Sequence, residues 1–144
     1  MTIVVLAGLP GSGKSTWLAL SGLTAISSDA MRKLLADDET DQTIHERVFE
    51  TVRFILRQRL EIGRAVSYID ATNLTPVERR PYIEIGINYG CRMEAIFFDV
   101  PLDVCLGRNA ARSRIVPADV MRAMAQRLIP PTTAEGFDSV TIVH

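Results

Sequence analysis

Apolar residues along the chain fall into short unbroken runs that alternate with helical spacings. The unbroken runs have the length and flanks of buried strands, and they cover residues 2–7, about 24–27, 65–70, 92–100 and 139–143. Helical spacings cover residues 14–21, 28–36, 44–62, about 75–90, 102–111 and 118–128. Strands that alternate with helices are typical of a parallel sheet covered on both faces. The pattern therefore predicts an α/β sandwich with its chemistry at the carboxyl ends of the strands.

The longest predicted helix, residues 44–62, shows the clearest amphipathic spacing. Its apolar face consists of Ile44, Val48, Val52, Ile55 and Leu56. Thr43 and Glu46 have the spacing of a capping box at its start, and Gly63 is expected to end it. Residues 75–78, Thr-Pro-Val-Glu, predict the start of another helix with proline at its first position.

Residues 8–17, "GLPGSGKSTW", connect the first predicted strand to the first predicted helix. Gly8, Gly13, Lys14 and Ser15 fill the spacing G-x-x-x-x-G-K-[ST] of a phosphate-binding loop. Glycines let backbone N–H groups approach phosphate oxygens, and the following helix points its positive end at the same anion. We expect this loop to hold ATP with Mg²⁺, the Ser15 hydroxyl facing the metal. The expected nucleotide contacts are Gly11, Ser12, Gly13, Lys14, Ser15 and Thr16. The fold class expected is thus a P-loop NTPase-like three-layer sandwich.

Composition and charge limit the number of domains and the kinds of partner that the chain is expected to have. A chain of 144 residues with 47% apolar and 23% charged residues predicts one globular domain over residues 1–144. The net charge of −1 argues against a broad basic surface, so a polyanion would have to be gripped locally. Cys91 and Cys105 lack metal-ligand spacing and are expected to be reduced thiols. No apolar run reaches membrane-spanning length, so we expect a cytoplasmic protein without a membrane partner.

Three kinds of protein use such a loop: GTPase switches, ATP-hydrolysing motors and phosphotransferases. A GTPase usually reads guanine with an Asn-Lys-x-Asp stretch, which lysines only at positions 14 and 33 do not allow. A motor ATPase usually ends an acidic strand with Asp-Glu, whereas Asp70 is followed by Ala71. Asp70 is placed either to hold Mg²⁺ through water or only to cap the turn that follows it. Both absences favour transfer of the phosphate to an acceptor.

A phosphotransferase needs a base for the acceptor hydroxyl, and Asp29 has the right position. It lies at the start of a predicted helix, directly after the second predicted strand. There it would accept the hydroxyl proton, and Arg32, one turn later on the same face, would hold an acceptor phosphate. The alternative is a capping aspartate with a surface arginine.

The stretch "GRNAARSRIVP", residues 107–117, predicts a short lid that carries arginines. Arg108 and Arg112 are four residues apart on a predicted helix end, and Arg114 precedes the Pro117 break. Phosphoryl transfer places negative charge on equatorial oxygens, which arginines on a closing lid can stabilise. A solvated arginine face is the alternative, although no acidic residue occurs between Asp103 and Asp119.

These stretches together resemble the P-loop 5′-hydroxyl polynucleotide kinases, the kinase module of bacteriophage and animal end-healing enzymes. The matching stretches are "GLPGSGKST", "SDAMR", "IDATNLTP", "FDVP", "RNAARSRIVP" and "PPTTAEGFDSV". The resemblance implies that Asp29 is the general base and that Arg32 binds the 3′-phosphate of the acceptor. It also implies that Lys14 and Ser15 serve the donor phosphates and Mg²⁺, that Arg112 clamps the transferring phosphate and that Arg108 assists.

Two features depart from the family. Ser28 stands where family members often have an arginine, and we expect these 144 residues to contain the kinase module without the phosphatase or ligase of several relatives. P-loop kinases of small-molecule hydroxyls, such as nucleosides, sugars or antibiotics, share the loop and a similar Asp–Arg pair. The function that the resemblance implies is transfer of the γ-phosphate of ATP to the 5′-hydroxyl of DNA or RNA in end repair. A small-molecule kinase is the alternative, and a nucleotide-binding regulatory protein is a third possibility.

Overall fold

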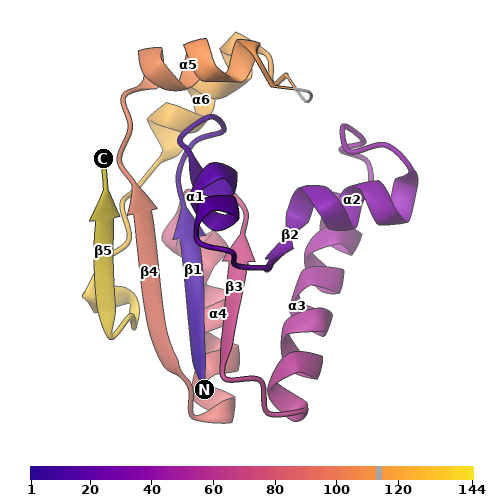
Figure 1. The fold of residues 1–144 in the computed structure, drawn as a ribbon, viewed down its shortest axis with the longest axis vertical. Coiled ribbons are helices and arrows are strands. Elements are labelled where there is room, and N and C mark those ends of the chain that lie inside the picture. The colour runs from indigo at the N-terminus through magenta and orange to yellow at the C-terminus, as the bar shows by residue number, and fades with distance from the viewer. Residues whose placement is uncertain (113–114) are drawn as a thin grey trace.

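The computed structural model describes residues 1–112 and 115–144, and within them the strands form one parallel sheet of five. The strands are β1 (Thr2–Ala7), β2 (Ala25–Ser27), β3 (Val66–Asp70), β4 (Arg92–Phe98) and β5 (Ser139–Val143). Their order across the sheet is β2-β3-β1-β4-β5, and all strands end at the same edge, as Figure 1 shows. Because β1 lies in the centre, the loop that follows it begins in the middle of that edge.

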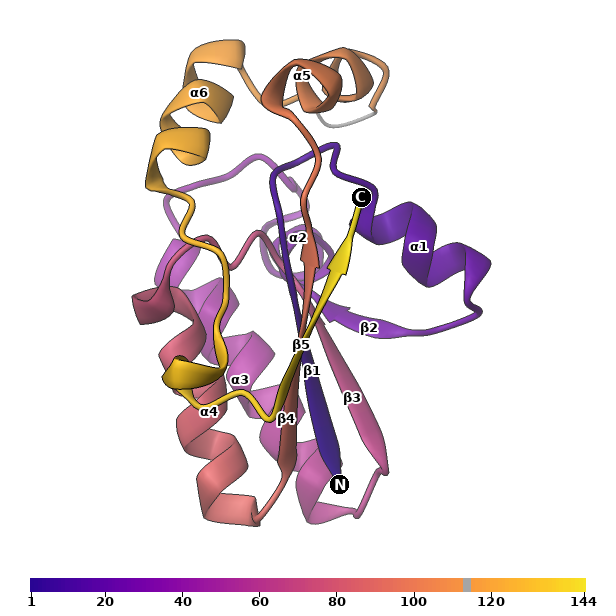
Figure 2. The same ribbon diagram turned by 90° about the vertical axis from the view of Figure 1, so that its left-hand side faces the viewer.

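Helices cover both faces of this sheet. They are α1 (Lys14–Leu20), α2 (Ser28–Ala36), α3 (His45–Glu61), α4 (Pro76–Tyr89), α5 (Leu102–Ala110), α6 (Ala118–Arg127) and the 3-10 turn η1 (Thr133–Glu135). Figure 2 shows α1 on one face and α3 with α4 on the other, while α5 and α6 lie above the carboxyl ends of the strands. The predicted α/β sandwich is confirmed, and the strand and helix bounds agree with the sequence pattern to within a few residues. Among the described residues, no helix is both long enough and apolar enough to cross a bilayer.

The two faces of β1 explain why the strands are apolar without alternation. Ile3 and Val5 belong to a buried cluster that α3 and α4 cover, whereas Leu6 packs with Leu18 of α1 and with Phe98. A strand covered on both faces gains from apolar side chains at every position. The cost of polar substitution is therefore high all along the strand that leads into the glycine-rich loop.

The helices α3 and α4 differ in how their N-termini are capped. Thr75 accepts a hydrogen bond from the Glu78 backbone and Glu78 bonds back, so the predicted capping box of α4 is present. The capping box predicted at Thr43 and Glu46 is wrong. The Asp41 carboxylate accepts hydrogen bonds from both the backbone N–H and the hydroxyl of Thr43, at 2.9 and 2.6 Å. That turn takes the Thr43 hydroxyl away from α3, which begins at His45 and whose N-cap residue, Ile44, provides no side-chain cap.

The stretch "PPTTAEGFDSV" ties the last strand to the rest of the fold. The Glu135 carboxylate receives two hydrogen bonds of 2.8 Å from the fully buried Arg79 of α4. Arg79 also donates to the carbonyl of Asn73, whose side-chain amide donates to Leu6 in β1. Asp138 accepts a hydrogen bond from the Met93 backbone N–H. This stretch, which is prominent in the sequence, is therefore held in the interior framework and not in the site described next.

Candidate active site

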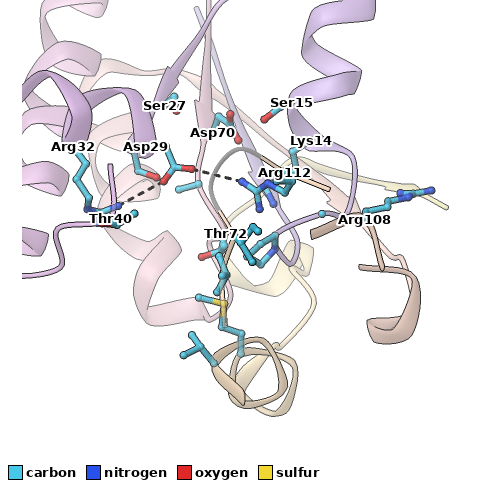
Figure 3. Close-up of a pocket in the computed structure, with 18 of the residues that line it drawn as sticks. Lys14, Ser15, Ser27, Asp29, Arg32, Thr40, Asp70, Thr72, Arg108 and Arg112 are labelled. Atoms are coloured by element: carbon cyan, nitrogen blue, oxygen red, sulfur yellow. Dashed lines mark ion pairs between the residues drawn. The ribbon is translucent and has the colours of Figure 1, made fainter. Parts of the chain in front are cut away.

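A cavity of about 1080 Å³ lies at the carboxyl edge of the sheet, where Figure 3 shows most of its polar side chains. Five segments line it: the glycine-rich loop, the β2–α2 junction, the loop before α3 with the first turns of that helix, the turn after β3, and the region from α5 to α6. Parallel strands deliver these segments to one edge, as expected for this kind of sheet. The predicted site residues Gly11, Gly13, Lys14, Ser15, Thr16, Asp29, Arg32, Asp70, Arg108 and Arg112 all line this cavity.

The glycine-rich loop depends on glycine at two positions. Gly11 has a φ of 80° and Gly13 a φ of 101°, both in the left-handed region that other residues rarely adopt. At Gly11 a Cβ would also lie only 2.7 Å from the carbonyl oxygen of Cys105, so the loop and α5 are in direct contact. Gly13 is the residue before α1, and the first residues of that helix, Lys14, Ser15 and Thr16, line the cavity. Ser12, by contrast, is buried and does not line the cavity.

The ammonium group of Lys14 is buried and forms hydrogen bonds with the glycine-rich loop. Its Nζ donates to the carbonyl oxygens of Gly8 at 2.7 Å and Leu9 at 3.0 Å, and to Ser12 Oγ at 3.5 Å. Burial lowers the pKa of Lys14 to about 8, and the nearby Asp70 carboxylate opposes that shift. The ammonium is therefore stabilised by exchangeable carbonyl contacts, which an arriving phosphate can replace.

Ser15 and Asp70 are the two oxygen donors that suit a magnesium ion. Ser15 is exposed to the cavity at the start of α1, and Asp70 is the last residue of β3. Burial raises the pKa of Asp70, and the charge of Lys14 opposes the rise. No cluster of three or more acidic, histidine or cysteine side chains that could hold a metal exists among the described residues. Mg²⁺ takes one or two protein ligands and completes its shell with water and substrate phosphates, so Ser15 and Asp70 could serve as those ligands.

Asp29 and Arg32 lie at the start of α2, on one face. Ser27, not Asp29, caps the helix, because its hydroxyl accepts the hydrogen bond of the Ala30 backbone N–H at 3.2 Å. The alternative that Asp29 serves as the cap is therefore wrong. The Asp29 carboxylate instead lies 3.6 Å from the guanidinium of Arg32, which is only 4% exposed. Ser28, which precedes Asp29, is buried and also lines the cavity.

Arg112 approaches Asp29 from the opposite side of the cavity. Its Nη2 lies 3.9 Å from the second oxygen of the Asp29 carboxylate, so Asp29 stands between two guanidinium groups, as Figure 3 shows. Nη1 of Arg112 is buried and has no hydrogen-bond partner within the described part of the chain. A buried donor in this position fits an anionic ligand in the cavity.

The positions of Arg108 and Arg112 relative to α5 differ from those predicted from the sequence. Arg108 lies in the last turn of α5, but Arg112 follows the end of that helix, so the two are not on one helical face. Figure 3 shows Arg108 pointing away from Asp29, on the side of Gly13. Arg114 lies outside the described residues.

Asn109 fixes both ends of the segment that carries Arg112. Its amide nitrogen donates to the Val116 carbonyl at 2.6 Å, and its amide oxygen accepts from the Val116 N–H at 3.0 Å. Asn109 is buried, and α5 rests on the loop at Gly11. The segment that carries Arg112 is therefore anchored on either side to the framework of the phosphate-binding loop.

Sequence reasoning did not find the residues of the cavity wall beyond Arg32. Thr40, Gln42, His45 and Phe49 come from the loop before α3 and from its first turns. Val116, Pro117, Val120 and Met124 add an apolar wall from the start of α6. The only signal in the sequence was the i, i+4 spacing of His45 and Phe49 on a polar part of the helix.

Comparison with known proteins agrees with this architecture. Residues 3–131 match the family model described as an AAA domain. The L-seryl-tRNA(Sec) kinase of Methanococcus maripaludis is 24% identical over 94% of this chain, which spans 56% of that kinase. A putative kinase from Chloroflexus aurantiacus superposes with a TM-score of 0.74 at 18% identity, covering 99% of this chain and 84% of its own.

Two other solved structures have the same fold. The Pnkp1/Rnl/Hen1 complex matches with a TM-score of 0.64 at 22% identity, covering 81% of this chain and 40% of the chain compared. A gluconokinase from Sinorhizobium meliloti matches with a TM-score of 0.63 at 18% identity, covering 99% and 81%. With a family model that covers most of its length, the chain belongs to this AAA domain family.

Proposed function

We propose that the chain is an ATP-dependent polynucleotide 5′-hydroxyl kinase. The observation that carries the proposal is the position of Asp29, a carboxylate between Arg112 on the side of the phosphate-binding loop and Arg32 on the opposite side. A base must lie within hydrogen-bond reach of the acceptor hydroxyl, and that hydroxyl must also reach the donor phosphate. A carboxylate near both guanidinium groups meets these two requirements.

On the donor side, the backbone of Gly11 and Gly13 and the side chains of Lys14 and Thr16 would bind the phosphates of ATP. Arg108 lies next to Gly13 and would add charge to the same end of the cavity. Ser15, with Asp70 through water, would hold Mg²⁺, which when bound neutralises charge on the donor phosphates.

On the acceptor side, Asp29 orients the hydroxyl and accepts its proton. The hydroxyl oxygen then forms a bond to the γ-phosphorus as the bond between that phosphorus and the β–γ bridging oxygen breaks, which leaves ADP and a phosphate monoester. The guanidinium of Arg112 stabilises negative charge on the equatorial oxygens. Arg32 binds the phosphate that follows the terminal nucleoside, because a planar guanidinium suits phosphate oxygens.

The open acceptor end of the cavity supports a polymeric acceptor. Thr40, Gln42 and His45, which line that end, are exposed, so a chain that enters there has room to continue. The net charge of −1 suits a grip on one or two phosphates and not a long basic track. The L-seryl-tRNA(Sec) kinase and the Pnkp1/Rnl/Hen1 RNA repair complex, which this chain resembles, support an acceptor that contains nucleic acid.

A second candidate is a kinase of a small-molecule hydroxyl. It is favoured by the similar fold of the gluconokinase and by the apolar wall at Val120 and Met124, which would suit a compact substrate. In that case Arg32 would bind a charged group of the small molecule.

The two candidates separate in one acceptor panel. Radiolabelled ATP and Mg²⁺ are offered with a 5′-hydroxyl oligonucleotide, a nucleoside 3′-monophosphate, a free nucleoside or gluconate. A polynucleotide kinase labels the first two and hardly the nucleoside, which lacks a phosphate for Arg32. Label on the nucleoside or gluconate alone, or on none of the four, would contradict the proposal.

A further inference from the structure

Two aromatic rings lie at the acceptor end of the cavity, beyond Arg32. His45 and Phe49 are one turn apart on α3, their ring centroids are 4.8 Å apart, and both line the cavity. Neither ring has a part in the donor or proton-transfer chemistry described above. Their position next to an arginine that suits a phosphate requires an explanation.

His45 is in contact with that arginine. Its Nδ1 lies 3.4 Å from Nη2 of Arg32. A guanidinium only donates hydrogen bonds, so Nδ1 is the atom of His45 that can accept one from Arg32. The contact places the imidazole ring directly beside Arg32.

Phe49 is not explained by the hydrophobic core. It is half-buried, and it belongs to none of the three buried apolar clusters in the described part of the chain. The buried face of α3 is formed by Val48, Val52, Leu56 and Leu60. Phe49 instead packs against the exposed ring of His45 at an interplanar angle of 49°, and both rings line the cavity wall.

We infer that His45 and Phe49 form a stacking subsite for the second nucleobase of the acceptor strand. The inference rests on the proposed function. Along the wall, Asp29 contacts Arg32, Arg32 contacts His45, and His45 contacts Phe49. A 5′ end has the same order: terminal hydroxyl, phosphate, next nucleoside. Exposed aromatic rings bind bases by stacking, with little preference among them.

The subsite also predicts the minimum length of a good acceptor. A nucleoside 3′-monophosphate reaches Asp29 and Arg32 but has no base for the rings. A dinucleotide is the shortest acceptor that fills the whole wall. The enzyme is thus expected to prefer an acceptor with at least two nucleosides, and to accept any base in the second position.

The test measures kcat/KM for three acceptors. They are a 5′-hydroxyl dinucleotide, the same molecule without its second base, and the nucleoside 3′-monophosphate. The wild-type protein should use the intact dinucleotide about tenfold better than either of the others. In Phe49→Leu, which keeps an apolar side chain but removes the ring, this preference should fall to about twofold or less, with the affinity for ATP unchanged. Phe54→Leu is the matched control, since Phe54 is on the same helix, 54% exposed and outside the cavity.

Two results would overturn the inference while leaving the proposed function intact. One is equal use of all three acceptors by the wild-type protein. The other is a Phe49→Leu variant that loses activity on the three acceptors in equal proportion, which would mean that the ring only supports Arg32 through His45. If the wild-type protein phosphorylates none of them, the proposed function fails, and the subsite with it.

Discussion

Lys14 shows how a single buried residue prepares the site for an anion. Its ammonium has little contact with water and is held by carbonyl oxygens of its own loop. Carbonyls are weak partners for a full charge compared with a phosphate, so the charge is already placed and only its partners change on binding. The lowered pKa of Lys14 is the measurable consequence of this burial.

This predicts that nucleotide affinity falls at alkaline pH. Burial lowers the pKa of Lys14 to about 8, so the free protein loses the ammonium as the pH rises through that value, whereas binding of phosphate favours the charged form. From pH 7 to pH 9 the charged fraction falls about tenfold, and the Kd for the Mg²⁺–nucleotide complex should rise by about the same factor. Calorimetry at both pH values measures this. A Kd that does not change would contradict the assignment, and Lys14→Ala should bind weakly at both.

Asp29 is expected to act on the acceptor and not on the nucleotide. Asp29→Asn keeps the shape but removes the proton acceptor, so kcat should fall about a hundredfold or more while the affinity for ATP changes little. Asp37→Asn is the matched control. Asp37 is exposed at the other end of α2, with a left-handed φ of 59° that asparagine tolerates. Wild-type turnover in Asp29→Asn would show that Asp29 is not the base.

At the scale of elements, the lid is attached to the phosphate-binding loop. The backbone of α5 packs on Gly11 at a distance that excludes a Cβ, and Asn109 holds Val116 through two hydrogen bonds. The segment that carries Arg112 therefore starts and ends at points fixed to the loop. Arg112, just beyond the end of α5, lies 3.9 Å from the Asp29 carboxylate in this arrangement.

Arg112 is predicted to work through its planar fork. Arg112→Lys keeps the charge but cannot contact two phosphate oxygens at once, so kcat should fall at least about tenfold. Arg122→Lys, an exposed change on α6 outside the cavity, is the control. Rapid-quench measurement of the transfer step separates this effect from nucleotide binding. Equal rates for Arg112→Lys and the control would reduce Arg112 to a general electrostatic contribution.

At the scale of the whole molecule, the sheet depends on a contact between distant parts of the chain. The fully buried Arg79 of α4 is paired with Glu135, 56 residues later, and through Asn73 with β1. A buried cation is tolerated only while its partners remain. The contact thus ties η1, which precedes β5, to α4 and through it to the central strand.

We therefore predict a purely structural role for Glu135. Glu135→Ala leaves the Arg79 cation buried without its carboxylate, and the free energy of unfolding should fall by about 3 kcal/mol. Glu84→Ala, an exposed change on α4, should alter it by less than about 0.5 kcal/mol. Urea denaturation followed by circular dichroism measures both. Equal stability of the two variants would mean that the ion pair contributes little to the fold.

The features that could be predicted from the sequence are those that depend on neighbouring residues. Strand runs, the proline start of α4 and the glycine-rich loop were all correctly located, because each is specified by neighbouring residues. The capping box at Thr43 was wrong because Asp41, two residues earlier, competes for the same hydroxyl. His45, Phe49 and the Arg79–Glu135 pair were not found, since their meaning depends on residues that only the tertiary fold brings beside them.

The central claim is transfer of phosphate to a 5′-hydroxyl end. Its most direct test uses two oligonucleotides with blocked 3′ ends that differ only in having a 5′-hydroxyl or a 5′-phosphate, each incubated with ATP and Mg²⁺ and analysed by mass spectrometry. The account predicts that the first gains one phosphate, at its 5′ end, and that the second is unchanged. If neither oligonucleotide gains a phosphate while a small hydroxyl compound does, the claim is contradicted.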